Sequence, residues 1–151
     1  MKPPRIRPIA IGVFRRDGRI FVAEGYDPSK GETFYRPLGG SIEFGERGEE
    51  AVVRELREEV NAEVANLRYL GTLENIFTFD GRPGHEIVLV YEGDFADQAI
   101  YRKSMVIGRE EGGDSFKAVW KPLGDFAGDA PSRAPLYPDG LKELLEKYGP
   151  D

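Results

Sequence analysis

The feature that most constrains the fold is one amphipathic segment near the middle of the chain, Glu49–Val60. Val53, Leu56 and Val60 recur at the period of an α-helix and place one narrow apolar stripe on it. Asn61 follows the last periodic position, and asparagine is second only to glycine as a left-handed C-terminal cap. The pattern predicts a single helix that ends at Asn61 and buries one side against a core.

β-prone runs lie on both sides of this helix. The first two flank Asp17-Gly18, a pair that favours the two-residue turn of a hairpin. The expected strands are Ile9–Phe14, Ile20–Ala23, Leu67–Leu73, Ile76–Phe79, His85–Tyr91 and Phe116–Trp120. We further expect a polar loop at Glu24–Thr33, a turn at Asp80-Gly81, a short helix at Ala96–Tyr101 and a terminal helix through Leu141, Leu144, Leu145 and Tyr148. Strands before and after a central helix, with a further helix at the end, indicate an α/β fold with a mixed β-sheet between helices.

Length and charge narrow the class of protein. A chain of 151 residues has the size of one ordinary domain, and no repeat or linker divides it, so we expect a single domain over residues 1–151. The net charge of −6 disfavours an extended nucleic-acid surface or an anionic membrane as partner. No apolar run approaches the ~18 residues that span a bilayer. We therefore expect a cytoplasmic protein with no membrane partner.

The shortage of soft ligands limits the metals that this chain could bind. It contains no cysteine and one histidine, which excludes disulfides, thiolate or multi-histidine metal sites and cysteine nucleophiles. Any resident metal ion must therefore be a hard cation held by oxygen atoms, either magnesium or manganese.

Three carboxylates of the predicted helix suggest where such a cation would bind. Glu55, Glu58 and Glu59 have the i, i+3, i+4 spacing that places them on one face. Their like charges repel, and Arg54 can neutralise only part of this repulsion. A divalent cation would resolve the rest, because carboxylate oxygens are the ligands that magnesium prefers.

The segment before the helix suits the same purpose. Gly39, Gly40 and Gly45 let the backbone approach a ligand closely or adopt a positive φ. Glu46 could reach the carboxylate face or a water molecule bound there. A glycine-rich segment that leads into an acidic helix favours a metal–phosphate complex over a bare anion, for which the lysine of a P-loop would be expected.

The order and spacing of these residues resemble one known family. Six fixed identities share the spacing of the Nudix box, and these are Gly40, Glu46, Arg54, Glu55, Glu58 and Glu59. Chance would produce such a match on the order of once per million start positions. The chain is thus similar to the Nudix hydrolase superfamily, with MutT-like members. It departs from the family pattern at Asn61, where the box has glycine, at the small residue Ala62, and at Leu38, which interrupts the usual Pro-Gly-Gly.

The resemblance implies a Nudix-type α/β/α sandwich that hydrolyses a nucleoside diphosphate linked to another group. Glu55, Glu58, Glu59 and the carbonyl oxygen of Gly39 would ligate the metal, and Glu46 would act through its water. Arg54 would hold the carboxylates in register, since its planar guanidinium can contact two carboxylate oxygens at once. The partners implied are a small nucleotide substrate and Mg²⁺ or Mn²⁺, with a homodimer left open.

The residues that contact substrate or act as general base are less constrained by the sequence. We expect substrate contacts from Arg36, Gly40, Glu86 and Glu111. The general base is left open between a glutamate of the box, Glu86, Glu110, Glu111 and Asp114. Further candidate contacts, each with an ordinary structural interpretation as well, are Tyr26, Lys30, Phe77, Phe79, His85 and Trp120.

Two questions stay open at this level. The stretch Leu73–Phe79 has neither the proline nor the tyrosine that marks some subfamilies, so a nucleoside triphosphate, a nucleotide sugar or an RNA end all remain candidates. The alternative to an enzyme is a catalytically silent Nudix fold that senses nucleotides. The intact Glu55, Glu58 and Glu59 favour the enzyme.

Overall fold

A computed structural model describes residues 3–126 and 134–149. In chain order, its elements are β1 (Ile6–Arg16), β2 (Arg19–Asp27), β3 (Glu32–Arg36), β4 (Leu38–Ser41), α1 (Gly48–Val60), β5 (Val64–Phe79), β6 (Arg82–Phe95), η1 (Gln98–Arg102), β7 (Met105–Arg109), β8 (Ser115–Pro122), η2 (Leu123–Asp125) and α2 (Leu141–Lys147). The strands form one mixed sheet in the order β5-β6-β1-β2-β8-β7, with β3 on β2 and β4 on β1. The predicted α/β class with a mixed sheet is confirmed.

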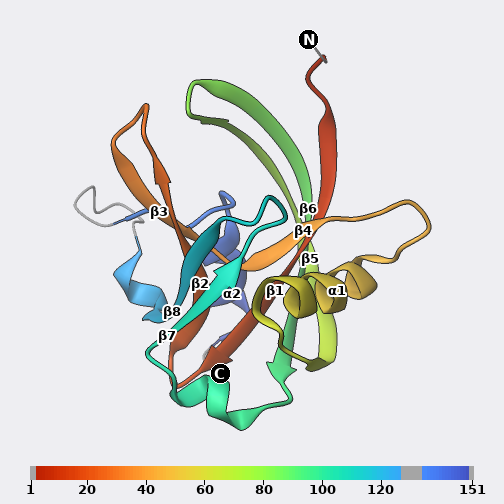
Figure 1. The fold of residues 1–151 in the computed structure, drawn as a ribbon, viewed down its shortest axis with the longest axis vertical. Coiled ribbons are helices and arrows are strands. Elements are labelled where there is room, and N and C mark those ends of the chain that lie inside the picture. The colour runs from red at the N-terminus through yellow and green to blue at the C-terminus, as the bar shows by residue number, and fades with distance from the viewer. Residues whose placement is uncertain (1–2, 127–133, 150–151) are drawn as a thin grey trace.

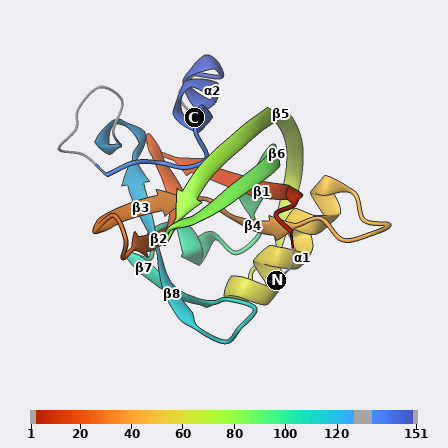
Figure 2. The ribbon, with the colours of Figure 1, turned by 90° about the horizontal axis from the view of Figure 1, so that it is seen from above.

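Each face of the sheet carries its own core, and β1 contributes to both. Ala10 and Phe14 point to one core together with Leu56 of α1. Ile9 and Ile11 point to the other core, which contains the buried side of α2. Because successive side chains of a strand alternate between faces, one apolar strand supplies both cores. Figure 2 shows the result, with α1 and α2 on opposite sides of the strands.

The sheet opens between β1 and β2, and this opening creates room for a site. The two strands pair only next to their shared turn, at Arg15–Ile20 and Arg16–Arg19. Beyond that point β3 pairs with β2, while β4 pairs with β1. The sheet thus has a first half (β5, β6, β1 and β4) and a second half (β3, β2, β8 and β7). The hairpins β2–β3 and β5–β6 rise on the same side of the molecule, above α1 (Figure 1).

Local signals in the sequence predicted turns and helix ends well. Asp17 and Gly18, like Asp80 and Gly81, have positive φ at both positions, as the hairpin turns require. Asn61 caps α1 with φ 53° and ψ 40°, in the left-handed conformation that we expected. No helix in residues 3–126 and 134–149 has the length and apolar character needed to cross a bilayer.

Several element boundaries differ from those expected from the sequence, because strands pair with partners that are distant in the chain. The expected loop at residues 24–33 is wrong, because β2 continues to Asp27 and β3 begins at Glu32. The two strands expected at residues 67–79 are one strand, β5, whose backbone pairs with β6 along its length apart from two irregularities. The short helix near residue 98 is a 3₁₀ turn, η1, and strand β7 was not expected. In each case a partner strand or a local turn supplies the hydrogen bonds, and neither shows in residue pattern alone.

Candidate active site

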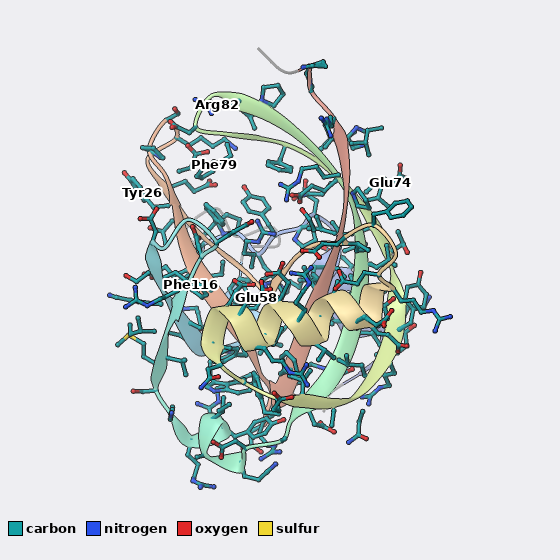
Figure 3. All side chains as sticks on the ribbon, turned by 45° about the vertical axis from the view of Figure 1, so that its right-hand side comes forward. Tyr26, Glu58, Glu74, Phe79, Arg82 and Phe116 are labelled. Atoms are coloured by element: carbon teal, nitrogen blue, oxygen red, sulfur yellow. The ribbon has the colours of Figure 1, made fainter. Side chains whose placement is uncertain are left out.

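A cleft of about 980 Å³ lies between the two halves of the sheet and one side of α1. The structure brings nine of the predicted site residues to this cleft. These residues are Arg36, Gly39, Gly40, Arg54, Glu55, Glu58, Glu59, Glu86 and Glu111. Glu110, Phe77 and Phe79 also line it. Figure 3 shows Glu58 on α1 below the hairpin tips that carry Tyr26, Phe79 and Arg82.

Other candidates lie elsewhere. Trp120 packs against the core beneath α1, where its indole N–H donates to the carbonyl of Ile100 at 3.0 Å. His85 lines a second, adjoining cavity between the β5–β6 hairpin and the start of the chain. The Lys30 ammonium pairs with Asp27 at 3.8 Å. Asp114 and Tyr26 are exposed and are not among the residues that line the cleft.

Helix α1 presents its carboxylates because its opposite side is anchored in the core. Val52 and Leu56 are fully buried in that core. At the start of the helix, the Glu50 carboxylate accepts a hydrogen bond from the backbone N–H of Arg47 at 2.8 Å. This cap satisfies one backbone donor that the helix itself leaves unpaired. Glu50 therefore has a structural role, away from the cleft.

Arg54 joins the carboxylates of the site. Its Nε and Nη2 donate to Glu46 at 2.8 and 3.0 Å, and Nη2 also donates to the carbonyl of Ser41 at 2.9 Å. Its Nη1 donates to Glu55 at 3.0 Å and to Glu58 at 3.3 Å. The Glu46 contact raises the pKa of Arg54, and in return the guanidinium lowers the pKa of Glu46. Glu46 thus holds Arg54, while Arg54 spans the two helix carboxylates.

Glu59 is the least satisfied of the three helix carboxylates. Burial and the neighbouring Glu55 raise its pKa to about 8, against the opposing effects of Arg36 and the Gly39 backbone. Its Oε1 is buried, and within the described residues it has no hydrogen-bond partner. A buried acceptor without a partner carries a desolvation cost that a positively charged ligand would remove.

The glycine pair of β4 forms the opposite side of this site. Gly39 has a φ of +154°, and a Cβ there would overlap the backbone of Ala10 in the adjacent strand β1. A Cβ on Gly40 would come within 2.5 Å of the Glu55 carboxylate. Both glycines therefore let β4 lie close to the core strand and to the acidic side chains at once. The backbone of Gly39 also reaches Glu59, where its hydrogen bond lowers the pKa of that carboxyl.

The oxygen atoms of Glu55, Glu58 and Glu59 are of the type that binds a divalent cation, but they are not already arranged around one point. Oxygen donors are what magnesium and manganese require, and the buried Oε1 of Glu59 accepts no hydrogen bond from the described residues. Nevertheless, no three acidic or imidazole side chains among residues 3–126 and 134–149 are already arranged to hold a metal ion. In this state, Arg54 supplies the positive charge between Glu55 and Glu58.

Strand β6 contributes a second buried carboxylate to the cleft. Glu86 on β6 is 4% exposed, and Arg7 on β1 approaches it at 3.6 Å. Arg7 also donates to the hydroxyl of Ser41 at 2.6 Å. Five residues that line the cleft were not predicted from the sequence, and these are Arg7, Arg109, Phe34, Phe116 and Tyr137. They come from segments far apart in the chain, and no local pattern in the sequence marks them.

Comparison with known proteins gives a consistent result. The sequence model of the NUDIX domain matches residues 3–140. An NAD-capped RNA hydrolase NudC of Pseudomonas aeruginosa is 42% identical over 97 residues, which cover 64% of this chain and 32% of that protein. The NudC of Photorhabdus laumondii is 44% identical over 69 residues, or 46% of this chain and 26% of that protein. The chain thus spans a third or less of the length of these curated relatives.

Solved structures resemble this one over nearly its whole length. A MutT NUDIX hydrolase from Burkholderia pseudomallei has a TM-score of 0.65 at 23% identity, covering 94% of this chain and 97% of that one. A NUDIX hydrolase from Nitrosomonas europaea has a TM-score of 0.65 at 16% identity, covering 95% and 88% respectively. At these identities the similarity shows a shared fold.

Proposed function

This chain belongs to the NUDIX domain family, and from that premise we propose that it hydrolyses a pyrophosphate bond in a nucleoside diphosphate linked to another group. One observation carries the proposal. The buried carboxylate of Glu59, with an unpartnered oxygen, faces the same cleft as Glu55, Glu58 and the Arg54 that joins them. An arrangement of this kind is costly for a purely structural helix and suited to a positively charged ligand.

A divalent cation, Mg²⁺ or Mn²⁺, would be held by Glu55, Glu58, Glu59 and the carbonyl of Gly39. When bound, such an ion neutralises charge on the pyrophosphate and lowers the pKa of an attacking water molecule. Arg54 has a positioning role here, because it fixes Glu55 and Glu58 while Glu46 fixes Arg54. That role needs a planar guanidinium, which lysine cannot replace.

The other walls of the cleft would bind and orient the substrate. Arg36 lies within electrostatic reach of Glu59 and offers a positive charge for a phosphate oxygen. Gly40 leaves the space beside Glu55 open. Glu86, held by Arg7, and Glu111, on the exposed β7–β8 turn, would contact the leaving or nucleoside portion.

The general base lies among the acidic residues that reach the cleft. A glutamate of α1, Glu86, Glu110 and Glu111 all line the cleft, so each has access to a water molecule there. Asp114 does not line it, and its carbonyl accepts the Glu110 N–H at 2.8 Å within the turn. We therefore propose the base among the lining residues and leave Asp114 aside.

The test is a hydrolysis screen with Mg²⁺ and with Mn²⁺. The panel contains nucleoside triphosphates, nucleotide sugars and dinucleotides, and the relatives called NAD-capped RNA hydrolases add NADH and NAD-capped RNA. Glu59→Gln is the inactive reference. Glu50→Gln is the matched control, because it changes a carboxylate of the same helix outside the cleft and keeps an acceptor for the cap. Turnover of one class that is lost in Glu59→Gln and kept in Glu50→Gln is the expected result. Turnover that survives in Glu59→Gln would contradict the proposal.

A second function, nucleotide sensing without turnover, has one observation in its favour. The guanidinium of Arg54 already neutralises Glu55 and Glu58 through ion pairs of 3.0 and 3.3 Å, without a metal ion. Glu58→Gln separates the two functions, because it should abolish turnover in an enzyme and leave nucleotide binding largely intact in a sensor. Absence of turnover throughout the panel, with nucleotide binding retained, would favour the sensor.

A further inference from the structure

Two phenylalanines of the cleft are each paired across the sheet with a glycine. Phe34 on β3 lies directly opposite Gly25 on β2. Phe77 on β5 lies directly opposite Gly84 on β6. Both rings line the cleft, and both are half-buried. The same construction therefore occurs once in each half of the sheet.

The glycines hold these rings flat on the strands. A Cβ at Gly25 would come within 2.5, 2.7 and 3.0 Å of three neighbouring ring atoms of Phe34. A Cβ at Gly84 would likewise overlap the ring of Phe77. Each ring thus covers the bare backbone of its partner. The ring of Phe34 also contacts that of Tyr137, with 5.5 Å between centroids. Because both phenylalanines are only half-buried and line the cleft, part of each ring is exposed to it.

Core packing does not account for these two rings. The buried clusters on the two faces of the sheet, with the half-buried residues packed against them, include neither Phe34 nor Phe77. Phe116 makes a useful contrast. It also lies over a glycine, Gly108, and lines the cleft, but it packs against the core beneath α1. Phe116 therefore packs against a buried cluster, whereas Phe34 and Phe77 do not.

Phe79 joins the two rings into one aromatic strip. It lies two residues from Phe77 on β5, hence on the same side of the strand. The ring of Phe79 meets that of Phe34 edge to face, with 6.0 Å between centroids. The strip consists of Phe34, Phe79 and Phe77 and crosses from the second half of the sheet to the first.

A buried carboxylate fastens the two hairpins that carry the strip. Asp27, at the end of β2, is 2% exposed. It accepts hydrogen bonds from the backbone N–H groups of Ser29 and Lys30 in its own hairpin, at 3.0 and 3.3 Å. It also accepts one from the N–H of Asp80, at the tip of the β5–β6 hairpin, at 3.2 Å. The Ser29 hydroxyl donates to the Asp80 carboxylate at 2.8 Å. The strip is therefore held in place before any ligand binds.

We propose that Phe34 and Phe77 are stacking platforms for the nucleobase of the substrate, so that the cleft recognises a nucleotide by its planar ring. This inference builds on the proposed function, which places the pyrophosphate near α1. A phenyl face carries no donor or acceptor, so stacking accepts every base and favours the larger purines. Rings held in advance by glycine lose little freedom on binding, which makes the contact effective.

Binding in the presence of EDTA tests the inference without hydrolysis. The probes are ADP, which has a base, and inorganic pyrophosphate, which has none, both titrated by calorimetry. We expect Phe34→Leu and Phe77→Leu to weaken ADP binding by about tenfold and to leave pyrophosphate unchanged. Phe34→Trp should keep or improve ADP affinity. Phe44→Leu is the control, because Phe44 is fully exposed outside the cleft.

A further variant moves the ring of Phe77 without replacing this residue, and the circular dichroism spectrum checks that the protein is folded. Gly84→Ala leaves Phe77 itself unchanged but pushes its ring off the strand, and it should also weaken ADP binding with a retained circular dichroism spectrum. Equal losses for ADP and pyrophosphate, or no loss in any of the three variants, would overturn the inference. So would wild-type protein that binds ADP no more tightly than pyrophosphate. Because no turnover is measured, base-dependent binding can persist even if the hydrolase proposal fails.

Discussion

Removing the charge of Glu59 should stabilise the metal-free protein at alkaline pH. Burial and, to a smaller extent, the adjacent Glu55 raise the pKa of this carboxyl from an ordinary value of 4.5 to about 8. Between these two values the folded protein keeps a proton that the unfolded chain releases. The free energy of unfolding therefore falls as pH increases across this window. The contribution is fully present below about pH 4.5 and is lost as the pH passes 8.

The size of this effect follows from the shift. One pKa unit corresponds to about 1.4 kcal/mol, so the full window is worth at most about 5 kcal/mol, and less if water enters the cleft. Glu59→Gln cannot ionise and should not show the loss. A glutamine also adds an N–H₂ group to a buried position, but that cost is independent of pH. The informative quantity is therefore the pH dependence of the difference between variant and wild type.

Urea unfolding in EDTA at pH 5, 7 and 8.5 measures this difference. Relative to wild type, Glu59→Gln should gain several kcal/mol of unfolding free energy between pH 5 and pH 8.5. Glu58→Gln is the control, because that side chain is 57% exposed, and its difference from wild type should vary little. A Glu59→Gln difference that stays constant over this pH range would refute the reasoning about burial.

Three further predictions concern the network around the site. Arg54→Lys should lower kcat/KM by about a hundredfold in the hydrolysis assay, because lysine cannot contact Glu46 and the helix carboxylates at the same time. Arg57→Lys, on the exposed face of the helix, is the control and should have little effect. Asp27→Ala leaves three backbone N–H groups without their acceptor and should lower the unfolding free energy by about 3 kcal/mol in urea, with the exposed Asp125→Ala near zero. Asn61→Gly should leave the unfolding free energy unchanged or raise it by up to about 1 kcal/mol, because the backbone at this position is left-handed. Asn61→Ala should lower the unfolding free energy by about 1 kcal/mol. Equal melting temperatures for the two variants would contradict the role of Asn61 as a cap.

The features that sequence alone determined are those set by neighbours in the chain. The period of α1, its cap at Asn61 and the turns at Asp17-Gly18 and Asp80-Gly81 all follow from local backbone preferences. The spacing of Glu55, Glu58 and Glu59 likewise requires only that the segment be a helix. Their common face, and the family pattern that contains them, could therefore be predicted from the sequence.

What only the tertiary structure decided depends on segments that are distant in the chain. Long-range packing produces three features of the site. These are the burial of Glu59, the hydrogen bonds between Arg54 and Glu46, and the opening of the sheet between β1 and β2. The glycine partners of Phe34 and Phe77 depend on strand register, which a shift of one residue would change completely. Local sequence predicts which groups are present, but register and packing between distant strands decide which of them meet.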